Sequence, residues 1–261
     1  MAVITVVSAK GSPGVSLAVW GLLHMWPRPI VGIELDESGG TLAYRHGLTC
    51  EPGLASLAAT QEQLNLQRSS AHGCPVGESK ILVCAPKEGT IVRAAVGWLT
   101  EPLLAWPDTD DLILDLGRVR PGEMQYSPAL RRADVAVLVS GTRADELATS
   151  ASVITELAAA IRPTTQVHLL FVASGPYPAE EAADALNGLV KRRLFRIAGT
   201  VPFDTKAAGE FSDGGRRASK VLARWYGPIA AELAAATAHR TSPIDARYDE
   251  SSAELNVNGA R

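Results

Sequence analysis

Short apolar runs alternate with longer amphipathic segments along nearly the whole chain. The apolar runs end at Gly, Pro or acidic turns and predict buried strands at residues 2–8, 29–35, 80–85, 111–116, 134–140, 166–173 and 194–201. The longer segments predict helices at residues 16–26, 90–106, 145–161, 178–190 and 216–237, with breaks at Pro102 and at Gly227–Pro228. Because the strands are apolar throughout rather than alternating, we expect an α/β fold with a mostly parallel central sheet and helices on both faces.

Two stretches fall outside this alternation. Residues 60–78 are polar and have little periodicity, so they predict an excursion on the surface. Residues 241–261 are polar and mildly acidic, which is typical of a disordered tail. The remaining chain, residues 1–240, is expected to form a single domain.

Composition narrows the class of protein. Hydrophobic residues make up 46% of the chain and charged residues 20%, which excludes general disorder, and the net charge of −3 leaves no global basic field for nucleic acid. The amino terminus has no basic region before its short apolar run, and no stretch reaches the ~18 apolar residues needed to span a bilayer. The three cysteines are an odd number and predict no disulfide framework. We therefore expect a cytoplasmic protein.

The segment between the first predicted strand and the first predicted helix carries the most chemical information. It reads Gly11-Ser12-Pro13-Gly14-Val15-Ser16. A glycine-rich turn at this place aims backbone N–H groups and a helix N-terminus at one point, which predicts a phosphate site. The usual phosphate loop ends in Gly-Lys-Ser/Thr; here the hydroxyl is present and the lysine is replaced by valine. A lysine instead precedes the loop, at Lys10.

With Lys10, this segment resembles the deviant Walker A motif of the MinD/ParA family of P-loop ATPases. The resemblance implies that residues 11–16 cradle the phosphates of ATP or ADP and that Ser16 binds Mg²⁺. It also implies that Lys10 is the signature lysine, which in that family reaches the nucleotide of a partner subunit. Val15 stands where the phosphate-binding lysine is expected.

Three later segments resemble motifs of the same family, in the same order. Glu34 and Asp36 end the second strand two residues apart, like the family's Asp-x-Asp segment, so both are expected to face one metal and Asp36 to act in catalysis. Asp115 ends a strand that resembles Walker B and is expected near Mg²⁺. Pro202 and Asp204 belong to a turn that resembles the family's adenine-binding turn.

The resemblance implies a P-loop NTPase fold and a divergent protein with a degenerate nucleotide site. One interpretation is a pseudo-ATPase or weak ATPase that serves as a positioning or recruiting platform, as in Tad-pilus, secretion or cell-division systems. The alternative is a nucleotide-dependent dimerising switch in chromosome or plasmid partitioning. Arg118 and Arg120 follow Asp115 and either replace the missing lysine or are two solvated surface arginines.

Protein partners and a homodimer follow from the same resemblance. DNA is a further candidate partner, because Arg216, Arg217, Lys220 and Arg224 recur at helical spacing, with residues 191–193 as additional cations. Such a row is more often a solvated helix face. The carboxyl terminus has no apolar face or lysine cluster, so no direct membrane anchor is expected.

Overall fold

A computed structural model describes residues 2–10, 14–60, 65–104, 110–120, 122, 128–190, 194–212 and 218–238. In these residues eight strands form one sheet, in the order β3-β4-β2-β5-β1-β6-β7-β8. The strands are β1 (Val3–Ser8), β2 (Ile30–Glu34), β3 (Cys74–Gly77), β4 (Lys80–Val83), β5 (Asp111–Arg118), β6 (Val135–Gly141), β7 (Gln166–Ala173) and β8 (Arg196–Pro202). All neighbours are parallel except β3, which is antiparallel to β4. The expected mostly parallel sheet is confirmed.

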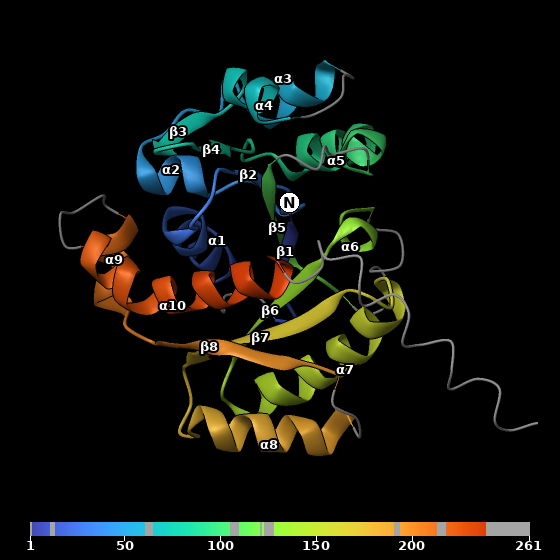
Figure 1. The fold of residues 1–261 in the computed structure, drawn as a ribbon, viewed down its shortest axis with the longest axis vertical. Helices are drawn as coiled ribbons and strands as arrows, with labels where there is room; N and C mark the ends of the chain where they lie inside the picture. Colours follow the sequence, from blue (N-terminus) through green and yellow to red (C-terminus); the bar gives the residue numbers. More distant parts are fainter. Residues whose placement is uncertain are drawn as a thin grey trace, which may run out of the picture.

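Helices cover both faces of the sheet (Figure 1). They are α1 (Val15–Met25), α2 (Leu42–His46), α3 (Leu54–Ala59), α4 (Leu66–Ala71), α5 (Gly89–Leu104), α6 (Pro128–Arg132), α7 (Ala144–Ala160), α8 (Ala179–Val190), α9 (Thr205–Ser212) and α10 (Ala218–Ala238). α1 and α10 pack together on one face, whereas α5 to α8 contribute to the cores on the other. This confirms the expected layers.

The apolar strands are explained by these two layers. In β6, Val135, Val137 and Val139 enter the core beneath α1 and α10, while Leu138 enters the core beneath α7 and α8. A central strand therefore has no water-facing side, and every position favours an apolar residue. Because β2, β5 and β1 are neighbours, the loops that follow them emerge at one edge of the sheet, which is where the candidate site forms.

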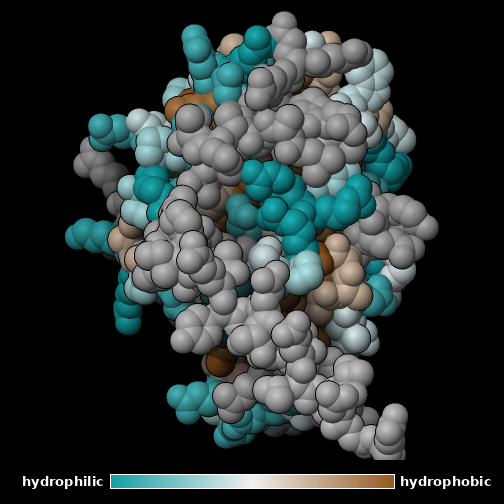
Figure 2. Space-filling model, turned by 45° about the vertical axis from the view of Figure 1, so that its right-hand side comes forward, coloured by the Kyte–Doolittle hydropathy of each residue, from teal (hydrophilic) through white to brown (hydrophobic). Residues whose placement is uncertain are grey.

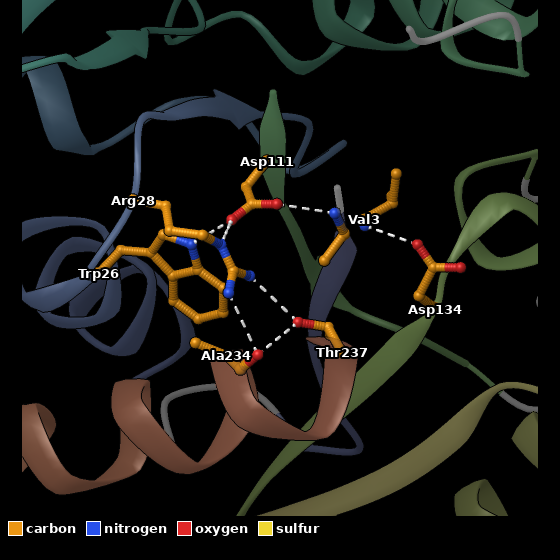
Figure 3. Close-up of polar contacts among 8 residues, drawn as sticks. Val3, Trp26, Arg28, Asp111, Asp134, Ala234 and Thr237 are labelled. Atoms are coloured by element: carbon orange, nitrogen blue, oxygen red, sulfur yellow. Dashed lines mark hydrogen bonds and ion pairs between the residues drawn. The ribbon is translucent and has the colours of Figure 1, made fainter. Parts of the chain in front are cut away.

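The opposite edge of the sheet is held by a buried carboxylate (Figure 3). Asp111 is 2% exposed and accepts hydrogen bonds from the Ala2 amide at 2.7 Å, the Trp26 indole at 2.7 Å and Arg28 Nε at 2.6 Å. The Arg28 guanidinium also donates to the Ala234 carbonyl at 3.2 Å and to the Thr237 hydroxyl at 3.1 Å. This network joins β5 and the start of β1 to the end of α10.

The two predicted helix breaks are wrong. α5 continues through Pro102 to Leu104, and α10 continues through Pro228 to Ala238. Proline inside a helix costs about 3 kcal/mol. In α10, burial of Tyr226, Ile229 and Leu233 in the core against α1 offsets that cost, since each large apolar side chain contributes about 2 kcal/mol.

The prediction for residues 60–78 is partly wrong, because this stretch contains two regular elements. α4 begins after Asn65, whose side chain accepts a hydrogen bond from the Arg68 amide at 2.8 Å as a helix N-cap. β3 then pairs antiparallel with β4, with Cys74 opposite Leu82. The predicted tail, 241–261, lies outside the described residues.

One face of the molecule is drawn in Figure 2, where hydrophilic residues gather near the centre of the view. Among the described helices, none is both long enough and apolar enough to cross a bilayer.

Candidate functional site

The loop after β1 leads into α1 through Gly14. Gly14 is left-handed, with φ 91° and ψ 37°, a conformation that favours glycine, and its carbonyl accepts from the Ala18 amide at 2.8 Å. The first turn of α1 contains no acidic residue and its N-cap makes no side-chain hydrogen bond. Within the described residues, no side chain of this turn neutralises the positive end of the helix, and such an end favours an anion. Gly11, Ser12 and Pro13 of the predicted cradle lie outside the described residues.

Val15 and Ser16 have different environments at the start of α1. Val15 is 7% exposed and belongs to the core between α1 and the sheet, where it packs with residues such as Val19. The position expected to hold the phosphate-binding lysine is thus used for packing. Ser16 is half-buried, and its hydroxyl lies beside the carboxylate of Asp115.

Asp115 is fully buried, and its two carboxylate oxygens have different surroundings. Oδ1 accepts from the Gly117 amide at 2.9 Å, while Oδ2 has no hydrogen-bond partner within the described part of the chain. Burial, followed by the nearby charge of Glu34, raises the pKa of Asp115 to about 7. An ionised Asp115 in this place therefore calls for a cation near Oδ2 and Ser16.

Lys10 lies two residues beyond the end of β1 and contacts α7. Its ammonium group forms a salt bridge with Asp145 in the first turn of that helix, and this pair lowers the pKa of Asp145. Arg143 lies 3.6 Å from the same carboxylate. Lys10 therefore has a partner within its own chain, and the role implied for it at the nucleotide of a partner subunit stays a prediction.

Glu34 joins two loops. Its Oε1 accepts from the Thr41 and Leu42 amides at 2.6 and 2.8 Å, and its Oε2 accepts from the Ala85 amide at 3.0 Å. Burial raises the pKa of Glu34, while these amides oppose the increase. Both oxygens are therefore already used to hold the start of α2 against the end of β4.

Asp36 lies beyond the end of β2 and has different partners. Its Oδ1 accepts from the Ser38 amide at 2.8 Å, and its carboxylate lies where a side chain at Gly117 would otherwise be. Because β2 ends at Glu34, the two-residue alternation of a strand does not extend to Asp36, and a metal shared by the two carboxylates stays a prediction. Among the described residues, no three His, Cys, Asp or Glu side chains form a metal cluster.

Pro202 and Asp204 stand at the same edge, at the end of β8. Asp204 is an N-cap of α9: its Oδ1 accepts from the Ala207 amide at 2.9 Å. β8 is three strands from β1, about 14 Å at the usual strand spacing. Their adenine-binding role stays a prediction.

The candidate DNA-binding row is described only in part. Lys220 and Arg224 are exposed on α10. Arg216, Arg217 and residues 191–193 lie outside the described residues, so the row stays a prediction.

Sequence reasoning missed two contributors to the site, Asp145 and the conformation of Gly117. Asp145 was identified only as the start of a helix, and its acidic first-turn position gave no indication of its distant partner. Gly117 has φ 60°, and the pairing of β5 with β1 shifts register beside it. A glycine two residues after Asp115, near the end of an otherwise apolar strand, was the available signal for such a bulge.

Comparison with known proteins identifies the fold. No protein-family model matches the sequence, and no curated protein matches it. A ParA family ATPase from Chlorobium tepidum TLS has a similar structure, with a TM-score of 0.65, 16% identity and coverage of 88% of this chain and 96% of that chain. The cell division ATPase MinD of Pyrococcus furiosus is also similar, with a TM-score of 0.65, 17% identity and coverage of 90% of this chain and 99% of that chain. A variant of McdA from Cyanothece in complex with ATP has a TM-score of 0.63 and 14% identity, and the match covers 90% of this chain and 96% of that chain.

The chain therefore has the P-loop fold of MinD/ParA-type ATPases over nearly its whole described length. The identities are low, so these likenesses show the fold and leave the chemistry of the site to its own residues.

Proposed function

We propose that this protein binds ATP or ADP with Mg²⁺ at the edge formed by Gly14, Ser16 and Asp115. The observation that carries the proposal is the buried, unpartnered Oδ2 of Asp115 beside the Ser16 hydroxyl. These groups fit Mg²⁺, which is usually held by one or two protein oxygens together with phosphates and water. Bound Mg²⁺ supplies neutralisation of phosphate charge.

Two solved structures with this fold contain the expected ligands. MinD from Pyrococcus horikoshii OT3 was solved with Mg-ADP, and the McdA variant from Cyanothece was solved with ATP. In the present chain, the open N-terminus of α1 would receive the phosphates, and Ser16 and Asp115 would hold the metal. Lys10 and Asp36 keep their predicted catalytic roles as part of this proposal.

Hydrolysis is proposed to be slow. A preorganised cation at the phosphates typically contributes about 3 kcal/mol to transition-state stabilisation, which corresponds to about 10²-fold in rate. Val15 supplies no charge, and its side chain is buried in the core. We therefore favour a pseudo-ATPase or weak ATPase that recruits protein partners over an efficient enzyme.

The partitioning-type dimerising switch remains the second candidate. The Lys10–Asp145 pair favours the recruiting platform over the switch, because the ammonium group of Lys10 already has a partner within its own chain. The exposure of this pair favours the switch, because the two side chains are 49% and 55% exposed and such surface pairs contribute only about 0–1 kcal/mol. A competing phosphate would therefore separate Lys10 from Asp145 at little cost.

Calorimetric titration tests nucleotide binding. We expect Mg-ATP and Mg-ADP to bind with a dissociation constant in the micromolar range or weaker. Asp115→Asn should remove most of the Mg²⁺ dependence of binding, whereas Asp184→Asn, at an exposed position of α8, should leave that dependence intact. Absence of both heat and thermal stabilisation at millimolar nucleotide contradicts the proposal.

A further inference from the structure

Arg118 lies at the beginning of the phosphate loop. It is the last residue of β5 and pairs in register with Ser8, the last residue of β1. The Val119 amide donates to the Ser8 carbonyl at 2.9 Å, which fixes the end of β5 against the start of the loop. The Arg118 side chain is exposed at this edge.

A bulge in β5 determines which face Arg118 belongs to. Val6 pairs with Asp115 and Ser8 pairs with Arg118, so two steps along β1 correspond to three along β5. Strict alternation would place Asp115 and Arg118 on opposite faces of the sheet. The extra residue reverses this: Arg118 comes to the face shared by Val6, Ser8 and Asp115, which is the face covered by α1.

Gly117 makes the bulge feasible. Its φ of 60° is left-handed, and a Cβ atom there would lie 2.1 Å from Cγ of Asp36. A side chain at this position is therefore excluded both by conformation and by space. The same glycine thus admits the Asp36 carboxylate and turns Arg118 toward the α1 face.

Among the residues that the structure describes, none pairs with the charge of Arg118. Within the described ranges its guanidinium has no ion pair or hydrogen bond, whereas Lys10 is paired with Asp145. Among the described residues, the buried Asp115 oxygen Oδ2 at this edge has no hydrogen-bond partner, and the first turn of α1 contains no acidic residue. An arginine fork is well suited to a phosphate bound at that end of α1.

We propose that Arg118 supplies the cation for the phosphate chain of a bound nucleotide that Val15 does not supply. This rests on the proposed nucleotide binding and adds a specific residue to it. The ligand chemistry is a nucleoside di- or triphosphate whose phosphate oxygens accept from the guanidinium. The bulge, rather than a lysine in α1, delivers the positive charge.

The test compares Arg118→Ala with Arg196→Ala by calorimetric titration of the full chain with Mg-ATP. Arg196 is a matched control, because it is also exposed but begins β8, at the opposite edge of the sheet. We expect the dissociation constant to rise at least about tenfold in Arg118→Ala and less than about twofold in Arg196→Ala. Arg118→Lys, which keeps the charge and loses the fork, should fall between them. Thermal unfolding without nucleotide should be unchanged in all three variants.

The outcomes separate this inference from the proposed function. If wild-type protein binds Mg-ATP and Arg118→Ala binds it equally well, Arg118 is a solvated surface arginine and the inference is overturned while nucleotide binding stands. If wild-type protein does not bind Mg-ATP or Mg-ADP at all, the proposed function fails and this inference fails with it.

Discussion

Arg28→Met should cost the protein about 3 kcal/mol of unfolding free energy. The substitution keeps the aliphatic length of the side chain and removes its charge and donors. Asp111 is only 2% exposed and would keep two neutral donors, the Ala2 amide and the Trp26 indole. A hydrogen bond to a charged group contributes about 1.5–3 kcal/mol.

The other hydrogen bonds of Arg28 add to the expected loss of unfolding free energy, whereas the partial exposure of its side chain reduces that loss. The bonds to the Ala234 carbonyl and the Thr237 hydroxyl each contribute about 1 kcal/mol. Breaking a fully buried pair costs about 3–5 kcal/mol, but the Arg28 side chain is 37% exposed, so water replaces part of what is lost. About 3 kcal/mol is a large fraction of a typical total of 5–15 kcal/mol.

Urea unfolding followed by circular dichroism measures the effect. Arg45→Met, at an exposed position of α2, is the control and should change stability by less than about 0.5 kcal/mol. A double-mutant cycle with Asp111→Asn should give a coupling of about 1–3 kcal/mol. A loss below about 1 kcal/mol in Arg28→Met, or no coupling, refutes the assignment of this network as a clamp between β5 and α10.

Two further predictions concern charge. Lys10→Ala should change the free energy of unfolding by less than about 1 kcal/mol, because the pair of Lys10 with Asp145 is exposed. Light scattering should show the same oligomeric state for wild type and variant, with and without Mg-ATP. A wild-type dimer that forms only with nucleotide and is lost in the variant supports the switch instead. His168 is 1% exposed, and burial lowers its pKa from 6.5 to about 4. The unfolded chain therefore binds this proton at a higher pH than the folded chain, and the free energy of unfolding falls as pH drops from about 6.5 to 4. This shift corresponds to about 3 kcal/mol, and His168→Gln should flatten the pH dependence of urea unfolding in that range; an unchanged slope contradicts the assignment.

The fold was predictable because its signal is local and repeated. Each long apolar run became a strand, and each long amphipathic segment became a helix. The errors lie where tertiary packing overrides a local preference: α10 continues through Pro228 because its flanking residues are buried against α1. β3 was missed because a four-residue edge strand containing Pro75 has little pattern of its own.

The site was predictable in its location and less so in its contacts. Ser16 in the first turn of α1 lies beside Asp115 of β5, and the roles expected for both at a metal stay predictions. The partner of Lys10 depends on α7, which is 135 residues away in sequence. The directions of Glu34 and Arg118 depend on where a strand ends or bulges, and sequence periodicity does not fix such points to one residue.

The position of Glu34 has a mechanical consequence. Its carboxylate binds the beginning of α2 on one side and the end of β4 on the other, and the Gly40 amide adds a bond to the Pro86 carbonyl at 2.8 Å. The loop carrying Asp36 is therefore coupled to the loop that leads into α5. A ligand that displaces one of these loops would therefore displace the other as well. Binding at the phosphate edge would in this way change the position of the loop that leads into α5.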